Sequence, residues 1–127
     1  MILLDTDILV DFFRGHAASR DWLLSQGSQP VAIPGFVAME LYAGCRNRIE
    51  RQTVQRNLSP YQILWPDDVA STTMIQLFAD AHLTHATGIL DSLIAATALS
   101  HNLPLHTFNQ KHFAAFPQLN VVQPYAR

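Results

Sequence analysis

The chain has 127 residues, and its eight basic and ten acidic side chains give a formal net charge of −2 at pH 7. Apolar residues make up 49% of it, which excludes a disordered protein and suffices for a buried core without disulfides. A protein that grips any nucleic-acid duplex by general attraction is disfavoured, because such proteins are strongly basic. A chain of this length is expected to form one domain, over residues 1–127.

Cysteine content and hydropathy indicate the cellular location. The only cysteine, Cys45, has no partner for an internal disulfide, which suits a reducing compartment. Charged residues or glycine interrupt the apolar runs well before the roughly 20 residues that a membrane-spanning helix needs. The N-terminus lacks the basic segment that precedes the apolar part of an export signal. We expect a cytoplasmic protein without a membrane partner.

The basic side chains are unevenly distributed along the chain. Seven of the eight are arginines, and four of these crowd one short segment: Arg46, Arg48, Arg51 and Arg56. Guanidinium groups in such a cluster can contact phosphates. A solvated helix face is the simpler explanation for at least half of them.

The first predicted element is a short buried strand, MILLD, which ends in an acid. Apolar residues then recur with helical spacing in TDILVDFFRG up to Gly15, and a second helix is expected from Ala17 to Gln26. PVAIP predicts another buried strand. Pro34 suits the first turn of the helix that follows and runs to Gly44.

The second half of the chain continues this alternation. A charged, exposed helix is predicted over 47–58, then a strand at YQILW, and then an amphipathic helix that starts at Pro66 and fades toward Gly88. Another helix is expected over 89–102, a strand over 105–107, a short helix near Phe113 and a last strand at NVV. This pattern predicts an α/β fold with a mostly parallel sheet of about five strands flanked by helices.

Three acids stand in apolar surroundings, whereas most acids of a soluble domain lie on solvated faces. Asp5 closes the first predicted strand, at the end where parallel α/β sheets bind ligands. Glu40 is the only charged residue of PGFVAMELYAG, so we expect it to be buried and compensated. Asp91 lies in the first turn of a helix, where the helix dipole favours its ionised form. The small residues Ala95 and Ala98 follow on its face and allow another element to come close.

Each of these acids also has a plainer explanation. Asp5 can cap the helix that follows it, a role equally open to the next two residues. Arg46 is available as a purely structural partner for Glu40. Asp91 can be a simple acid at a helix start.

Taken together, the three acids predict a single site, because strands of a parallel sheet and the helices beside them meet at one sheet edge. Three carboxylates there repel one another, and each resists ionisation unless a cation is present. Oxygen ligands without Cys or His at zinc spacing favour Mg²⁺ or Mn²⁺. Such an ion can activate water and stabilise the charge of a phosphate being displaced, so we expect phosphodiester hydrolysis.

Four segments stand in order over nearly the whole chain: LLDTDILVDFF, MELYAG, HATGILDSLIAATAL and LHTFNQKHF. Together they resemble the PIN-domain ribonucleases and, within that family, the VapC toxins of bacterial toxin–antitoxin pairs. The resemblance implies a PIN-like fold and a metal-dependent endoribonuclease that cuts RNA. It also implies a cognate antitoxin as partner, and a homodimer.

The resemblance assigns the site residues as well. The positions that match the family's metal-binding and catalytic ones are Asp5, Glu40, Asp91 and Asn109. Many relatives carry Asp at the last of these positions, so this chain is expected to hold Mg²⁺, or Mn²⁺, with one negative charge fewer. Thr6 and Thr107 lie beside these positions, and we expect their hydroxyls to support the ligands.

Two other functions remain open. A strand that ends in Asp-Thr-Asp is also similar to the opening motif of haloacid-dehalogenase-type phosphatases, in which Asp5 would be the nucleophile and Asp7 the acid or base. That class needs a suitably placed lysine, and the only lysine is Lys111. A PIN-like fold kept only for binding is the other alternative, with Asn109 as a sign of decay, and the three intact acids argue against it.

The six histidines form no group with zinc-like spacing and are expected on the surface. His112 follows Asn109 by three residues and can approach the site or an RNA phosphate. A loop histidine is the simpler interpretation.

Overall fold

A parallel sheet runs through the centre of the computed structural model, which describes residues 1–127. Its five strands lie in the order β3-β2-β1-β4-β5, and every neighbouring pair is parallel. The strands are β1 (Ile2–Leu4), β2 (Val31–Pro34), β3 (Gln62–Leu64), β4 (Leu105–His106) and β5 (Val121–Val122). The predicted α/β fold with a five-stranded parallel sheet is confirmed.

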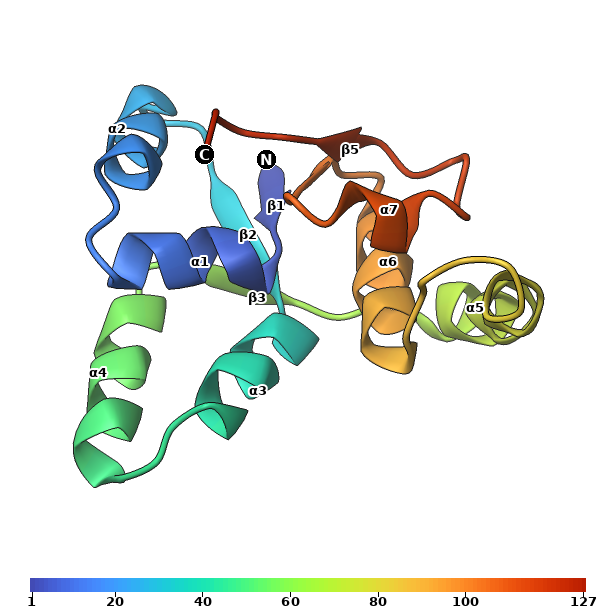
Figure 1. The fold of residues 1–127 in the computed structure, drawn as a ribbon, viewed down its shortest axis with the longest axis horizontal. Helices are drawn as coiled ribbons and strands as arrows, with labels where there is room; N and C mark the ends of the chain where they lie inside the picture. The colour runs from blue at the N-terminus through green and yellow to red at the C-terminus, as the bar shows by residue number, and fades with distance from the viewer.

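Seven helices cover the two faces of this sheet. They are α1 (Thr6–Phe13), α2 (Ala17–Ser25), α3 (Gly35–Ala43), α4 (Arg48–Leu58), α5 (Asp68–Ala81), α6 (Ile89–His101) and α7 (Gln110–Phe113). Figure 1 shows α1 to α4 on one side of the sheet and α5 to α7 on the other. The chain first moves outward from β1 to β3 and then crosses back to β4 and β5. Right-handed crossovers in the two directions place their helices on opposite faces.

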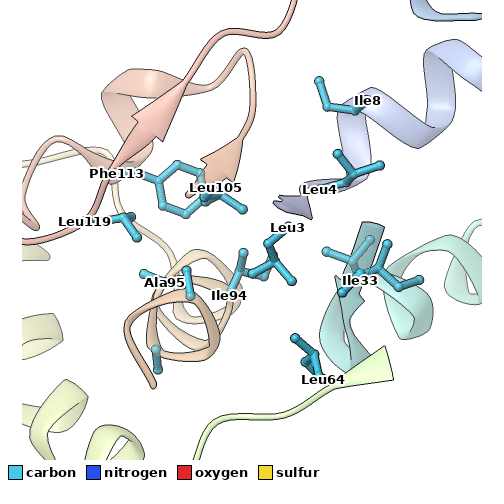
Figure 2. Packing of buried hydrophobic residues seen from close by; sticks show 14 of the residues in the cluster. Leu3, Leu4, Ile8, Ile33, Leu64, Ile94, Ala95, Leu105, Phe113 and Leu119 are labelled. Atoms are coloured by element: carbon cyan, nitrogen blue, oxygen red, sulfur yellow. The ribbon is translucent and has the colours of Figure 1, made fainter. Parts of the chain in front are cut away.

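The central strand is buried on both faces, which is why its sequence is apolar without alternation. Leu3 and Leu4 are both fully buried. In Figure 2, Leu3 lies beside Ile94 of α6, whereas Leu4 lies beside Ile8 of α1. Successive side chains of one short strand therefore pack against the two helical layers.

Several element ends differ from those predicted by sequence. Pro34 ends β2 in an extended conformation, with ψ 143°, and precedes α3 instead of lying in its first turn. Asn47 is the N-cap of α4, because its side chain accepts the Glu50 N–H at 2.9 Å. Helix α5 ends well before Gly88, since the next apolar side chain, Leu83, is 80% exposed and packs against nothing.

The strand order creates one place where neighbouring chain connections diverge. Strands β1 and β4 lie side by side, but the chain leaves β1 toward β2 and leaves β4 toward β5. In open α/β sheets such a switch point opens a crevice at the carboxyl ends of the strands. Asp5 follows β1 and Thr107 follows β4, so both stand at this point.

None of the helices is long and apolar enough to cross a membrane.

Candidate active site

Asp5 lies at the centre of the candidate site, directly after β1 and at the N-cap of α1. Its Oδ1 accepts the Thr6 N–H at 2.7 Å, and its Oδ2 accepts the Thr107 hydroxyl at 2.8 Å. Burial, followed by the charge of Asp7, raises the pKa of Asp5 to about 7 in spite of these hydrogen bonds. The side chain therefore caps the helix, and it does so where a negative charge is costly.

Asp7 is a member of the cluster that the family resemblance did not include. Its Oδ2 accepts the Phe108 N–H at 2.8 Å and lies 3.3 Å from the Thr107 hydroxyl. Its Oδ1 is buried without a hydrogen-bond partner. Burial is also the main cause that raises the pKa of Asp7. The signal in the sequence was the second acid of Asp-Thr-Asp, which was expected to be catalytic only in the phosphatase alternative and was otherwise a possible helix cap.

Glu40 joins the cluster from α3, but it is exposed, so the prediction of a buried Glu40 was wrong. The face of α3 that carries it points to solvent, as the 61% exposed side chain of Met39 shows. Oε1 of Glu40 accepts the Thr6 hydroxyl. Arg46 is not its partner, because Arg46 pairs with Glu50 at 3.1 Å. A hydrated carboxylate needs no buried counter-charge.

Asp91 lies in the first turn of α6, as predicted, and is half-buried. Its Oδ2 accepts the Gly88 N–H at 3.1 Å and lies 3.4 Å from Nδ1 of His112. Ala95 and Ala98 behind it are fully buried, so the small face of α6 does admit close packing.

Two histidines depart from the surface positions that we predicted. His112 lies on α7, which packs against α6 and brings its ring to Asp91. His106 ends β4 and is buried, and its ring packs 5.2 Å from that of Trp22. The spacing of His112 from Asn109 had left its approach to the site open, whereas no local pattern marks the contact of His106 with Trp22, which depends on packing between distant parts of the chain.

Asn109 reaches the site through its backbone. Its N–H donates to the Thr107 hydroxyl oxygen at 3.0 Å, while its side chain is exposed and forms no hydrogen bond as the N-cap of α7. The loop after β4 is thus tied to Asp5 and Asp7 by Thr107. The side-chain amide of Asn109 is exposed to solvent.

The hydrogen bonds unite some of the predicted residues and leave others apart. Asp5, Asp7 and Glu40 are linked through Thr6 and Thr107. Asp91 and Asn109 have no hydrogen bond to these acids, although α1, α3 and α6 all begin at the same end of the sheet (Figure 1). No three His, Cys, Asp or Glu side chains are arranged to hold one metal ion.

The electrostatic balance of the cluster is incomplete. The ion pairs of the structure join Arg46 to Glu50, His112 to Asp91 and Arg127 to Asp11. No lysine or arginine is paired with Asp5, Asp7 or Glu40. A set of carboxylate oxygens that includes the unpartnered Oδ1 of Asp7 has the donor chemistry that Mg²⁺ and Mn²⁺ favour. Because Mg²⁺ keeps several waters and takes one or two carboxylates, three converging protein ligands are not required.

Comparison with known proteins places this chain in a family. The PIN domain matches residues 2–119. Ribonuclease VapC10 of Mycobacterium tuberculosis is 37% identical over 123 residues, which cover 94% of this chain and 90% of that protein. Ribonuclease VapC19 of the same organism is 32% identical over 126 residues, with 94% and 97% covered.

Solved structures agree with this placement. A toxin–antitoxin complex from Klebsiella pneumoniae contains a chain with a TM-score of 0.79 and 29% identity, and the match covers 100% of both chains. VapBC2 from Rickettsia felis, bound to a DNA fragment from its promoter, gives a TM-score of 0.82 and 25% identity over 96% of this chain and 98% of that one. The chain belongs to the PIN-domain family and, within it, to the VapC group.

Proposed function

We propose that this protein is an endoribonuclease toxin that hydrolyses RNA phosphodiester bonds and needs Mg²⁺, or Mn²⁺, to do so. One observation carries the proposal: Asp5 is buried beside Asp7 at the switch point of the sheet, and no lysine or arginine forms an ion pair with either. The curated relatives described above are named as ribonucleases. The cytoplasm, which holds RNA and keeps thiols reduced, is the compartment that suits this activity.

Four residues of this chain are proposed to hold the ion: Asp5, Glu40, Asp91 and Asn109. When bound, the ion supplies a water of lowered pKa and stabilises negative charge on the phosphate. The hydroxyls of Thr6 and Thr107 donate to the carboxylates of Glu40 and Asp5 and so fix their orientation. Asp7 adds an acceptor, its Oδ1, that no group of the protein occupies.

The partners follow from the relatives. The two solved structures described above are toxin–antitoxin complexes, and we propose that a cognate antitoxin binds this chain as well. We also propose a homodimer, as the family resemblance implies. Sedimentation of the purified chain measures the second point, and a monomer at micromolar concentration would contradict it.

The experiment that tests the activity is incubation of the purified, partner-free chain with total RNA, with Mg²⁺ or with EDTA, followed by mapping of the new RNA ends. We expect cleavage only with Mg²⁺, and only a small residual rate from the isosteric variant Asp5→Asn. Cleavage that continues in EDTA, even when more chelator is added, would contradict the metal requirement. Absence of cleavage under both conditions would contradict the nuclease.

The family assignment disfavours the phosphatase hypothesis, and one experiment still separates the two chemistries. A phosphatase of that class forms an aspartyl-phosphate on Asp5, whereas a metal-activated water forms no covalent intermediate. Mass spectrometry after rapid acid quenching detects such an adduct. The variant Asp7→Asn does not separate them, because Asp7 anchors the Phe108 N–H and its loss would disturb either site.

A further inference from the structure

An open depression lined by arginines lies where α3 connects to α4. Its volume is about 690 Å³, and no acidic side chain lines it. The polar side chains in its wall are Arg46, Asn47, Arg48, Arg51 and Gln55. We call it the arginine pocket.

The helical repeat explains why these side chains gather. Arg48, Arg51 and Gln55 follow one another at intervals of three and four residues, so they share one face of α4. Asn47 caps the same helix at the end of the connection from α3. Side chains of one face and of the preceding connection therefore meet in a single concave surface.

The positive charge of the pocket is largely uncompensated. Arg46 pairs with Glu50, but its side chain is still 88% exposed. Arg48 and Arg51 are exposed and belong to none of the ion pairs of the structure. In a chain with a net charge of −2, this is a local site for an anion.

The arginine pocket adjoins a groove that reaches the candidate active site. A second groove, of about 550 Å³, is lined by Thr6 and Glu40 and, past the C-terminal end of α3, by Gly44, Cys45 and Glu50. Cys45 also lines the arginine pocket. From Glu40 to Gly44 the helix rises only about 6 Å. An extended nucleic-acid strand that runs from the acidic cluster along α3 therefore reaches the arginines within a few nucleotides.

We propose that the arginine pocket binds the phosphate backbone of single-stranded RNA on one side of the cleaved bond. The inference rests on the proposed function and names the residues that hold its substrate. Guanidinium groups match phosphate oxygens with two parallel hydrogen bonds. Tyr42, 37% exposed at the rim, offers an aromatic face to a neighbouring base. We expect a single strand as the ligand because the positive charge is confined to one pocket, whereas binding of a duplex requires a long basic surface.

The test measures binding without cleavage. Fluorescence anisotropy of a labelled single-stranded RNA 20-mer of mixed sequence is recorded with the full chain in EDTA, over a series of KCl concentrations. For single strands, each phosphate contact contributes about 0.7 to the slope of log Kd against log salt. The double variant Arg48→Ala/Arg51→Ala is expected to lower this slope by about 1.4 and to weaken binding at low salt by about 10-fold or more.

Two control variants isolate the position from the charge. Arg20→Ala/Arg56→Ala removes the same two charges from exposed sites outside the pocket, and binding should change by less than about 2-fold. Replacing Arg48 and Arg51 by lysine keeps the charge and should retain most of the slope. In cleavage with Mg²⁺, the alanine pair should raise KM and leave kcat nearly unchanged, because the pocket lies away from the reacting phosphate.

The outcomes separate this inference from the function on which it rests. If the wild-type chain cuts RNA but both double-alanine variants bind RNA equally well, the arginine pocket is not the substrate track and the nuclease stands. If the chain with Mg²⁺ neither binds nor cuts RNA, both proposals fail. If the pocket variant keeps its RNA affinity but loses that for the antitoxin, the pocket binds an acidic protein segment and the inference is overturned.

Discussion

Helix α1 and its N-cap carry three acids. Those at the start of the helix and the one near its end have opposite electrostatic surroundings. At the start of the helix, Asp5 is buried beside the half-buried Asp7, and neither belongs to an ion pair. Near its end, Asp11 is also buried, but it accepts the Arg127 guanidinium at 2.8 and 3.1 Å and the Tyr125 hydroxyl at 2.9 Å. The hydrogen bond with Arg127 is the main cause that lowers the pKa of Asp11, whereas burial raises that of Asp5.

The difference separates an acid that stabilises the fold from acids that destabilise it. The chain supplies a cation for Asp11 from its own C-terminal segment. It supplies none for Asp5, and a buried charge without a partner persists only where something else compensates it. The same C-terminal segment supports the site, because Arg127 stacks on Phe108 at 4.5 Å from the ring centroid, and the Phe108 N–H donates to Asp7.

The strongest test of this comparison is Asp5→Asn. Removal of the charge should reduce RNA cleavage by about 10³-fold or more, since an ion held by the cluster loses its central ligand. It should also raise the melting temperature of the metal-free protein, because an uncompensated buried charge disappears. Asp11→Asn is the matched control, and it should cut RNA well below its melting temperature. Full cleavage by Asp5→Asn would remove Asp5 from the site.

If the cluster acts as one unit, the loss from Asp5→Asn should also be non-additive. Combining it with Asp91→Asn should lower the residual cleavage rate only slightly further. Residual rates of the single and double variants, measured with excess enzyme, decide this. Fully multiplicative losses would show that the two acids act independently.

The pH dependence of stability sharpens the contrast. The pKa of Asp5 is about 7 in the fold against 3.8 in the unfolded chain, so the metal-free fold binds the proton more tightly. The free energy of unfolding should therefore fall as the pH rises from about 4 to 7, by up to ~4 kcal/mol, and level off above. Urea unfolding of wild type and Asp5→Asn in EDTA measures this. The variant should lose most of this fall and keep only the part that comes from the raised pKa of Asp7, and parallel profiles would contradict the placement of an uncompensated charge at Asp5.

Asp91 stands between the two cases, because it has one close side-chain neighbour, Nδ1 of His112 at 3.4 Å, but no lysine or arginine. His112→Ala should leave Asp91 less well oriented and raise the Mg²⁺ concentration for half-maximal cleavage by about 10-fold. His82→Ala, at the C-cap of α5, is the control and should have no effect. An unchanged Mg²⁺ requirement in His112→Ala would mean that Asp91 and His112 do not serve the ion.

Asp11→Asn tests the compensated acid. It should lower the free energy of unfolding at pH 7 by about 1 kcal/mol, a small value because the Arg127 side chain is 47% exposed and screened by solvent. The pKa of Asp11 in the fold lies below its usual 3.8, so its contribution is present above that pH and lost as the pH falls further. Wild type and variant should therefore become equally stable near pH 2. A difference that persists there would exclude the ion pair as its cause.

The smallest expected effect concerns Asn109, where a substitution can add a negative charge near the acids that have no ion pair. Asn109→Asp should lower the Mg²⁺ concentration for half-maximal cleavage by about 3-fold, since a carboxylate replaces an amide dipole. Added Mg²⁺ should also raise its melting temperature more than that of wild type. Equal Mg²⁺ dependence of both proteins, in cleavage and in melting, would place Asn109 outside the coordination sphere.

The sequence by itself determined the elements and the positions of two acids. An unbroken apolar run predicts a strand buried on both faces, and β1 is one; helical spacing placed most helix ends within a residue or two. Asp5 and Asp91 were located correctly at a strand end and in a first turn. Such features depend on near neighbours in the chain, and periodicity records near neighbours.

Only the tertiary structure decided which side chains meet. Thr107 reaches Asp5 over 102 residues of chain, and Arg127 reaches Asp11 over 116. The exposure of Glu40 depended on which face of α3 turns away from the sheet, which an almost uniformly apolar helix does not reveal. These contacts are set by strand order, crossover hand and helix rotation. Each of those is a property of the packed whole, because it is fixed by burial of the layers against one another and not by any local pattern.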